Sequence, residues 1–172
     1  MKSKNIIKLI LLFVMILSQN LNAETIFFDS KNIKIEEDGN MIFATKGKAN
    51  IPSSNLIIEG DKFIYDKRIS ELIVIDDVKY FDKEKKIYIE SQKIIYNEID
   101  NIIFSNSDTF ISNEDIYKIY STNILYDRNL NVISSNEFTK IIEKNDNNFL
   151  FNKGLIFELI PEIISSKEVK VI

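Results

Sequence analysis

Gly60-Asp61-Lys62-Phe63-Ile64-Tyr65-Asp66 decides the fold of this 172-residue chain, because related stretches recur at a fixed distance. Gln92 to Asn97 and Thr122 to Asp127 repeat its pattern of two apolar residues followed by Tyr. Five anchor positions in phase, 30 or 31 residues apart, are Ile35, Tyr65, Tyr96, Tyr126 and Phe157. A fixed period of this size indicates stacked supersecondary units that bury their apolar faces against one another.

The composition of each repeat predicts β-strands. The chain is rich in Ile, Tyr, Phe and Val, and it has only 2 Pro and 4 Gly. Polar clusters interrupt the apolar segments about every 12 to 18 residues, for example Asp82-Lys83-Glu84-Lys85 and Asp127-Arg128-Asn129. This spacing is typical of long strands joined by tight turns. Each repeat is therefore interpreted as two long strands, such as Lys86 to Tyr96 and Asn101 to Ser112.

A change of parity within the first strand of each repeat predicts a bend. Leu56 and Ile58 alternate with polar residues, and so do Phe63 and Tyr65, but five positions separate Ile58 from Phe63. Side-chain direction has a period of two, so an odd gap moves the apolar set to the other face unless a bulge or corner intervenes. The same gap in four repeats places corners near Ser30, Gly60, Ser91 and Ser121. The predicted fold class is all-β: a repetitive antiparallel β-jelly-roll or V-shaped open sandwich built from two-strand repeats.

Residues 1–23 have the layout of a secretory signal peptide. Lys2, Lys4 and Lys8 precede the apolar run Leu9 to Leu17, and a polar segment ends at Ala23. The apolar run is shorter than the roughly 20 residues that a membrane span needs. We expect cleavage before Glu24, with an uncleaved anchor helix as the alternative, and a single domain over residues 24–172.

Charge and composition exclude several classes of function. Removal of residues 1–23 takes away three Lys and no acid, so the formal charge changes from −4 to −7, which argues against a nucleic-acid partner. The chain has no His and no Cys, which excludes the usual catalytic triads and zinc sites. No phosphate-binding glycine loop or calcium loop is present. We therefore expect no catalytic residue, no metal and no cofactor.

Two pairs of acids are the only candidates for enzyme chemistry. Glu36-Glu37 and Asp76-Asp77 could be compared with the carboxylate pair of a glycosidase. Both pairs lie at turns or at repeat-equivalent positions, which favours solvated strand ends. The protein is therefore predicted not to be an enzyme.

Stacked apolar strands predict a trough that could cover acyl chains, which cost about 0.8 kcal/mol per CH₂ when exposed to water. Parity alone does not say which face is inside. The candidate lining residues on the first strands are Ile33, Ile35, Phe63, Tyr65, Ile94, Tyr96, Ile124 and Tyr126, and those on the second strands are Phe43, Ile73 and Ile103. The alternative is an exported structural or protein-interaction module with a dry core, in which the tyrosines form cross-strand aromatic pairs.

The segment Gly60 to Asp66, preceded by Leu56-Ile57-Ile58-Glu59, resembles the OstA-like repeat of the periplasmic lipopolysaccharide-transport proteins. Ala44 to Ile51 resembles the Gly-Asn-Val element of that repeat, with Gly47 as its glycine. The resemblance covers Glu24 to Ile172. It is closest to the N-terminal periplasmic domain of the LptD-type assembly proteins, with the LptA-type bridge proteins as the near alternative.

The resemblance implies a non-enzymatic role in lipopolysaccharide transport, in the periplasm or at the outer membrane. It implies a slit-like apolar interior that holds the acyl chains of lipid A, and edge strands that pair with other jelly-roll Lpt-type proteins. The later repeats depart from the pattern, because Asp76-Asp77-Val78, Ser107 and Asn136 stand near the place of the glycine. Strand glycines usually mark bends, so these bends must be made by other residues or be absent.

Overall fold

The computed structural model of this chain describes residues 26–172, except 115, 146, 161, 167–168 and 172. The segment 1–23, expected to be a signal peptide, lies outside the described residues. Fifteen strands in the described part form one antiparallel sheet, which confirms the all-β prediction. Their bounds are β1 (Phe27–Glu36), β2 (Met41–Ile51), β3 (Leu56–Asp66), β4 (Glu71–Asp82), β5 (Ile87–Asn97), β6 (Ile102–Ser105), β7 (Thr109–Asn113), β8 (Tyr117–Ser121), β9 (Ile124–Asp127), β10 (Val132–Ser135), β11 (Thr139–Glu143), β12 (Asn148–Phe151), β13 (Leu155–Glu158), β14 (Ile163–Ser165) and β15 (Val169–Val171).

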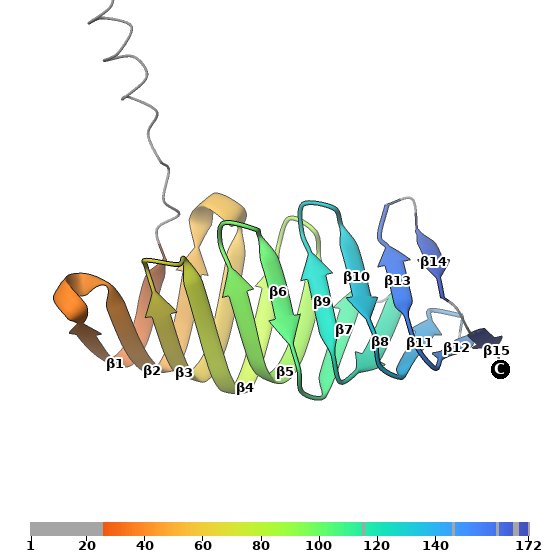
Figure 1. Cartoon of the computed structure of the whole chain (residues 1–172), viewed down its shortest axis with the longest axis horizontal. Helices are drawn as coiled ribbons and strands as arrows, with labels where there is room; N and C mark the ends of the chain where they lie inside the picture. Colours follow the sequence, from red (N-terminus) through yellow and green to blue (C-terminus); the bar gives the residue numbers. More distant parts are fainter. Residues whose placement is uncertain (1–25, 115, 146, 161, 167–168, 172) are drawn as a thin grey trace, which may run out of the picture.

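The sheet folds over on itself into two layers. β5 pairs with β6 through its second half and with β7 through its first half, so the sheet divides into two branches there. We call the branch of β6, β9, β10, β13 and β14, with the matching halves of β1 to β5, layer A. The branch of β7, β8, β11, β12 and β15, with the other halves, is layer B. The strands advance along the long axis from β1 at one end to β14 and β15 at the other (Figure 1).

The second strands of the later repeats are shorter than the sequence predicts. The expected strand from Asn101 to Ser112 is divided into β6 and β7, which are separated by residues 106–108. The two pieces pair with different halves of β5. The division therefore lies at the corner between the layers.

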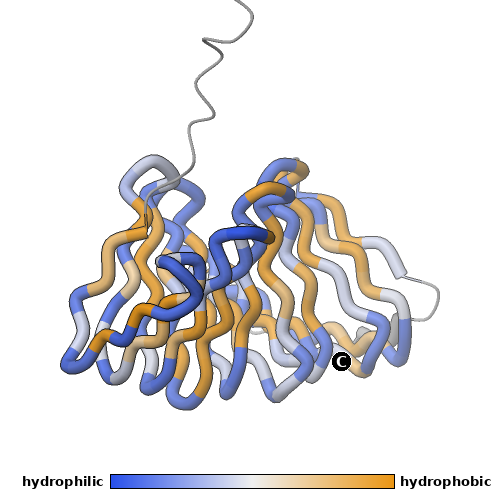
Figure 2. Tube along the Cα trace, turned by 60° about the vertical axis from the view of Figure 1, so that its left-hand side comes forward, coloured by the Kyte–Doolittle hydropathy of each residue, from blue (hydrophilic) through white to orange (hydrophobic). Residues whose placement is uncertain are grey.

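Each layer turns rows of side chains toward the interior, and the register of neighbouring strands defines one long row in each layer. In layer A the row runs across the strands as Ile35, Ile42, Tyr65, Leu72, Tyr96, Ile103, Tyr126, Ile133, Phe157 and Ile164. In layer B it begins Phe28, Ala49, Ile58, Tyr80, Ile89, Ile111, Ile119 and Ile141. Hydrophobic positions follow the strands and hydrophilic positions gather at the turns (Figure 2). Apart from the exposed Ile35, the residues of both rows belong to one hydrophobic core or pack against it.

The bends lie where the parity change predicts them. In β3 the buried positions are Leu56 and Ile58 before the bend and Phe63 and Tyr65 after it. The register with β4 shifts at the same level, between Glu59 and Lys62, and the register of β4 with β5 shifts between Ile75 and Val78. These bulges let both halves of one strand turn their apolar side chains toward the same interior.

Buried hydroxyls make the corners in the repeats that lack glycine. Ser91 Oγ lies 2.8 Å from Ser105 Oγ, and Ser105 Oγ lies 2.7 Å from Thr109 Oγ1. One repeat later, Ser121 Oγ lies 2.9 Å from Ser135 Oγ and accepts a hydrogen bond of 3.0 Å from Thr139 Oγ1. These side chains satisfy one another where the ladder hydrogen bonds change direction, so the corner leaves few polar groups unpaired.

Gly47 makes the corner between β1 and β2. A Cβ atom at this position would lie 2.1 Å from Asp29 O and 2.7 Å from Ser30 Cα, both of which are backbone atoms. A glycine is thus required because the backbones of two strands approach closely here, as expected for strand glycines at bends.

We expect Gly47→Ala to lower the free energy of unfolding by about 1–3 kcal/mol, because the added methyl group must displace the β1 backbone. Urea unfolding followed by circular dichroism would measure the change. Lys46→Ala is the matched control, since its Cβ is already present and its side chain is exposed. Equal stability of the two variants would contradict this account of the corner.

Candidate functional site

The space between the two layers contains most of the predicted lining residues. Seven of them belong to the buried core: Phe63, Tyr65, Ile94, Tyr96, Ile103, Ile124 and Tyr126. They all come from layer A and point toward layer B. In this structure they pack against the facing row, so they form a filled interior.

Ile33 and Ile35 lie on the same inner face but remain exposed, by 48% and 62%. Their cross-strand partners are Ala44 and Ile42, which are both buried. The difference arises because β1 pairs only with β2 among the described strands and is the last strand at that end. The apolar interior is therefore open to solvent at the β1 end.

Phe43 and Ile73 lie on the opposite face from the other predicted lining residues, which corrects their placement. Both alternate with buried neighbours, Phe43 with Ile42 and Ala44, and both are half-buried. The register explains why Ile73 was wrongly grouped with Ile103. Tyr96 pairs with Leu72 on one side and with Ile103 on the other, so Leu72, not Ile73, occupies the position equivalent to Ile103. Ile73 instead pairs across the outer face with Ile64 and Ile95.

The tyrosine anchors do not form aromatic pairs with one another. Tyr65 and Tyr96 both pair with Leu72, so an aliphatic side chain on β4 lies between them. Tyr96 and Tyr126 are separated in the same way by Ile103. The inner surface of layer A thus alternates aromatic and aliphatic side chains across the strands, which makes a nearly uniform apolar surface along the long axis.

Two phenol groups of the inner rows, those of Tyr80 and Tyr126, have raised pKa values. Burial raises the pKa of Tyr80 and of Tyr126 above the ordinary value, and the charge of Asp82 adds to the rise in both. The Tyr80 hydroxyl lies 3.5 Å from Asp82 Oδ2. Tyr126 Oη is buried and has no hydrogen-bond partner. An unpaired buried hydroxyl costs free energy that phenylalanine would not.

A buried ion pair joins the two layers at the edges farthest from the corners. Arg128 Nε donates to Asp82 Oδ2 at 2.6 Å, and the two side chains are 3% and 0% exposed. Arg128 also donates to Asn101 Oδ1 at 2.7 Å and to the Ser54 carbonyl oxygen at 3.1 Å. Burial would lower the pKa of Arg128, but the hydrogen bond that Arg128 donates to Asp82 and its charge interactions with Tyr80 and Asp82 together outweigh burial, so the pKa is raised and the guanidinium is charged.

Sequence reasoning missed this pair, because it treated both residues as parts of polar turns. A signal was present, since Val78, Tyr80 and Asp82 alternate, so Asp82 continues the inner face of β4. A carboxylate at an inner position requires a buried partner. The sequence does not show which cation supplies it, because Arg128 is 46 residues away.

Aromatic contacts join the layers at two other places. Phe28 in β1 meets Phe63 and Tyr65 across the interior, with ring centroids 5.9 and 6.3 Å apart. Toward the other end, Tyr117 in β8 meets Phe157 in β13 edge to face at 4.9 Å. Aromatic contacts therefore join the two layers on both sides of the ion pair.

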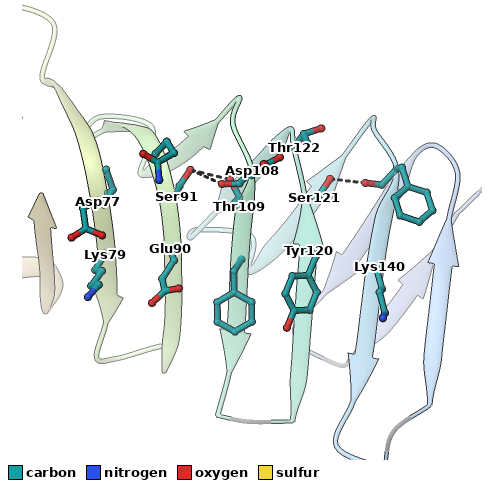
Figure 3. A pocket seen from close by; sticks show the side chains of 14 residues that line it. Asp77, Lys79, Glu90, Ser91, Asp108, Thr109, Tyr120, Ser121, Thr122 and Lys140 are labelled. Carbon is teal, nitrogen blue, oxygen red and sulfur yellow. Dashed lines mark hydrogen bonds between the residues drawn. The ribbon is translucent and has the colours of Figure 1, made fainter.

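A separate groove of about 740 Å³ lies on the outer face of layer B, near the corners. Phe110, Tyr120 and Phe138 supply aromatic rings, and charged side chains of both signs, such as Lys79 and Glu90, flank them (Figure 3). Lys79, Glu90, Phe110, Tyr120 and Lys140 form one cross-strand row on this face, between the buried inner positions. The groove is on the other side of the sheet from the buried lining residues.

The acid pairs show geometry expected of bends. Asp76 and Asp77 form the bulge of β4 with positive φ, and Asp76 Oδ2 accepts a hydrogen bond from Lys62 Nζ at 2.7 Å. Glu37 begins the short turn after β1 and lies 2.7 Å from Arg68. Within the described part of the chain, no three acidic side chains gather where they could hold a metal ion. No helix among the described residues is long and apolar enough to cross a membrane.

This two-layer arrangement is found in a solved structure. LptH from Pseudomonas aeruginosa, the LptA-homologous periplasmic component of the conserved lipopolysaccharide transport device, matches with a TM-score of 0.61. The match covers 70% of this chain and 98% of LptH, at 12% sequence identity. The chain has the LptA-like β-jelly-roll fold. The sequence matches no protein-family model and no curated protein.

The LptA-like fold agrees with the OstA-like resemblance of the repeat and confirms the predicted jelly-roll. At 12% identity the likeness establishes the fold alone. What the protein carries or binds must be argued from its own residues.

We expect the stability of the protein to fall as the pH rises above about 10, because unfolded tyrosine ionises there while folded Tyr80 and Tyr126 hold their protons. The sign follows from a folded pKa above the unfolded one: the stabilisation is complete below the unfolded pKa and is lost above it. Urea unfolding at increasing pH would measure it.

Tyr126→Phe isolates one of the two groups. This variant should be at least as stable as the parent at neutral pH, because the lost hydroxyl has no partner. Its stability should also fall less steeply above pH 10, since one fewer proton is linked to unfolding. An unchanged slope would show that Tyr126 does not hold its proton in the fold.

Proposed function

We propose that this protein carries the acyl chains of lipopolysaccharide between its two layers, as a non-enzymatic component of transport toward the outer membrane. The observation that carries the proposal is the inner row of layer A, in which aliphatic and aromatic side chains alternate across nine successive strands from Ile42 to Ile164. The LptA-like fold supports it.

The inner row suits a long apolar ligand. Each acyl CH₂ group gains about 0.8 kcal/mol when it leaves water, so continuous apolar contact is more important than specific polar contacts. The repeat presents nearly the same surface every 30 or 31 residues, so a chain can move along it with little change in free energy. Such transport needs no chemistry from the protein, and the direction of movement must come from a partner.

The ends of the stack support partners of the same fold. Each of the terminal strands β1, β14 and β15 pairs with one neighbour in the described structure. Exposed edges of this kind pair with strands of other chains. We propose that jelly-roll Lpt-type proteins add strands at these edges and extend the apolar interior, which is already open beside Ile33 and Ile35.

The proposed location is the periplasm or the outer-membrane surface, after cleavage of residues 1–23. The basic, apolar and polar parts of that segment support export. N-terminal sequencing of the protein recovered from the cell envelope would locate the cleavage site.

Photocrosslinking tests the acyl-chain site directly. A photoreactive phenylalanine at Phe63 or Tyr96, on the inner face, should form adducts with lipopolysaccharide in cells. Phe43 is the matched control, because it is the same residue type on the adjacent strand but on the outer face. Lys67 and Lys85, in turns, are further controls. Circular dichroism would establish that each variant is folded.

Adducts at the inner positions and none at Phe43 or the turns would establish the interior as the lipid site. If folded, exported protein gave no adduct at any inner position, the interior would be a dry core. The protein would then be an exported structural or interaction module with a dry, packed core.

A further inference from the structure

Beyond its open β1 end, the interior that the proposed function assigns to acyl chains is closed in this structure. The lining residues of layer A are buried against layer B, and Tyr96 and Tyr126 are 0% exposed. An acyl chain can enter from the side only if the layers separate. The contacts between the layers therefore decide where a lipid is admitted.

The corners are the less favourable place for separation, because strands β1 to β5 run through them without interruption. The opposite edges consist of turns, and there the layers meet only through side chains and hydrogen bonds. On the layer B edge, Asp82 ends β4 and Ser54 lies in the turn between β2 and β3. On the layer A edge, Arg128 follows β9 and Asn101 precedes β6. We call the contact of these four residues the edge clasp.

The edge clasp is polar, whereas the contacts on both sides of it are aromatic. Arg128 makes three hydrogen bonds, two of them to the opposite layer. Asp82 also accepts from the backbone amides of Glu84 and Lys85, at 3.1 and 2.9 Å, so it is held in place by its own turn. The hydrogen bonds from Arg128 to Asp82 and to Ser54, which would break when these edges separate, therefore belong to one guanidinium group.

A clasp of this kind can open more easily than an apolar seal. When a buried ion pair separates, both charges regain water, and their rehydration offsets much of the lost attraction. When packed aromatic residues separate, the exposed apolar surface gains nothing in return. The contact of Phe28 with Phe63 and that of Tyr117 with Phe157 are of the second kind.

We propose that the Asp82–Arg128 pair is a lateral gate: its opening separates the layer edges and admits acyl chains of an amphiphile to the inner row, and its closure retains them. This inference rests on the proposed function. Tyr80 and Tyr126, whose phenol groups lie in the field of the pair, are the first lining residues that an entering chain would meet.

A crosslinked variant tests the gate. The chain has no Cys, so Asp82→Cys/Arg128→Cys introduces a unique pair of thiols on the two edges. Without crosslinking, this variant lacks the ion pair and should take up lipid A carrying an environment-sensitive fluorescent acyl chain several-fold faster than the parent. A short, reducible thiol crosslinker should slow uptake by an order of magnitude or more, and reduction should restore it.

Glu37→Cys/Arg68→Cys is the matched control. Arg68 is the other arginine of the sequence, it also binds a carboxylate in a turn, and its nitrogen lies 2.7 Å from Glu37. Glu37 and Arg68 both lie on the layer A edge, so crosslinking them does not join the layers. Uptake by this variant should be the same before and after crosslinking.

A second comparison covers the case in which the double-cysteine variant does not fold. Arg128→Met keeps an unbranched apolar stem and removes the guanidinium charge, and Arg68→Met is its control. Faster uptake by Arg128→Met alone supports the gate, and equal rates in the two variants overturn it.

The outcomes separate the gate from the proposed function. Equal uptake by the open and the crosslinked Asp82→Cys/Arg128→Cys protein would overturn the gate and leave the acyl-chain site in place, with entry elsewhere, such as at the β1 end. No uptake by the parent or by any variant would overturn the acyl-chain site, and the gate with it.

Discussion

The whole structure depends on a bend at one level in every long strand. Side chains in a strand alternate between two faces, so a straight strand with the sequence of β3 would put Ile58 and Phe63 on opposite sides. The strand instead turns a corner between Glu59 and Lys62, where its register with β4 shifts, and both Ile58 and Phe63 then face one interior. Repetition of this bend in neighbouring strands gives two layers from a single sheet. The core, the open end at β1 and the meeting edges all follow from it.

Different residues achieve the bend in different repeats. Gly47 allows two backbones to approach closely, whereas later repeats use the buried hydroxyls of Ser91, Ser105 and Thr109. The equivalent residues 30 positions later repeat two of these contacts: Ser121 meets Ser135 and Thr139, as Ser91 meets Ser105 and Thr109. The geometry at the corner is thus retained while the chemistry changes. For this reason, a sequence pattern that requires glycine at the corner does not match the later repeats.

The interior combines a uniform apolar surface with one charged contact at its edge. The apolar rows account for burial and for the proposed movement of an acyl chain, because neither depends on a particular pair of residues. The pair of Asp82 and Arg128 has the opposite character, since it joins two specific turns. In the proposed mechanism, the rows hold a ligand and the pair controls access to it.

The sequence by itself determined the repeat, the all-β class, the corners and the shared parity of Phe63, Tyr65, Ile94, Tyr96, Ile124 and Tyr126 within their strands, because periodicity of side-chain direction is a local property. It could not place Phe43 and Ile73, because the outer face of layer A is also apolar, as Ile64 and Ile95 show, and parity does not distinguish two apolar faces. The inner face was decided by the pairing register. The contact of Asp82 with Arg128 was decided by the fold alone, because only the meeting of the two layers brings together turns that are 46 residues apart.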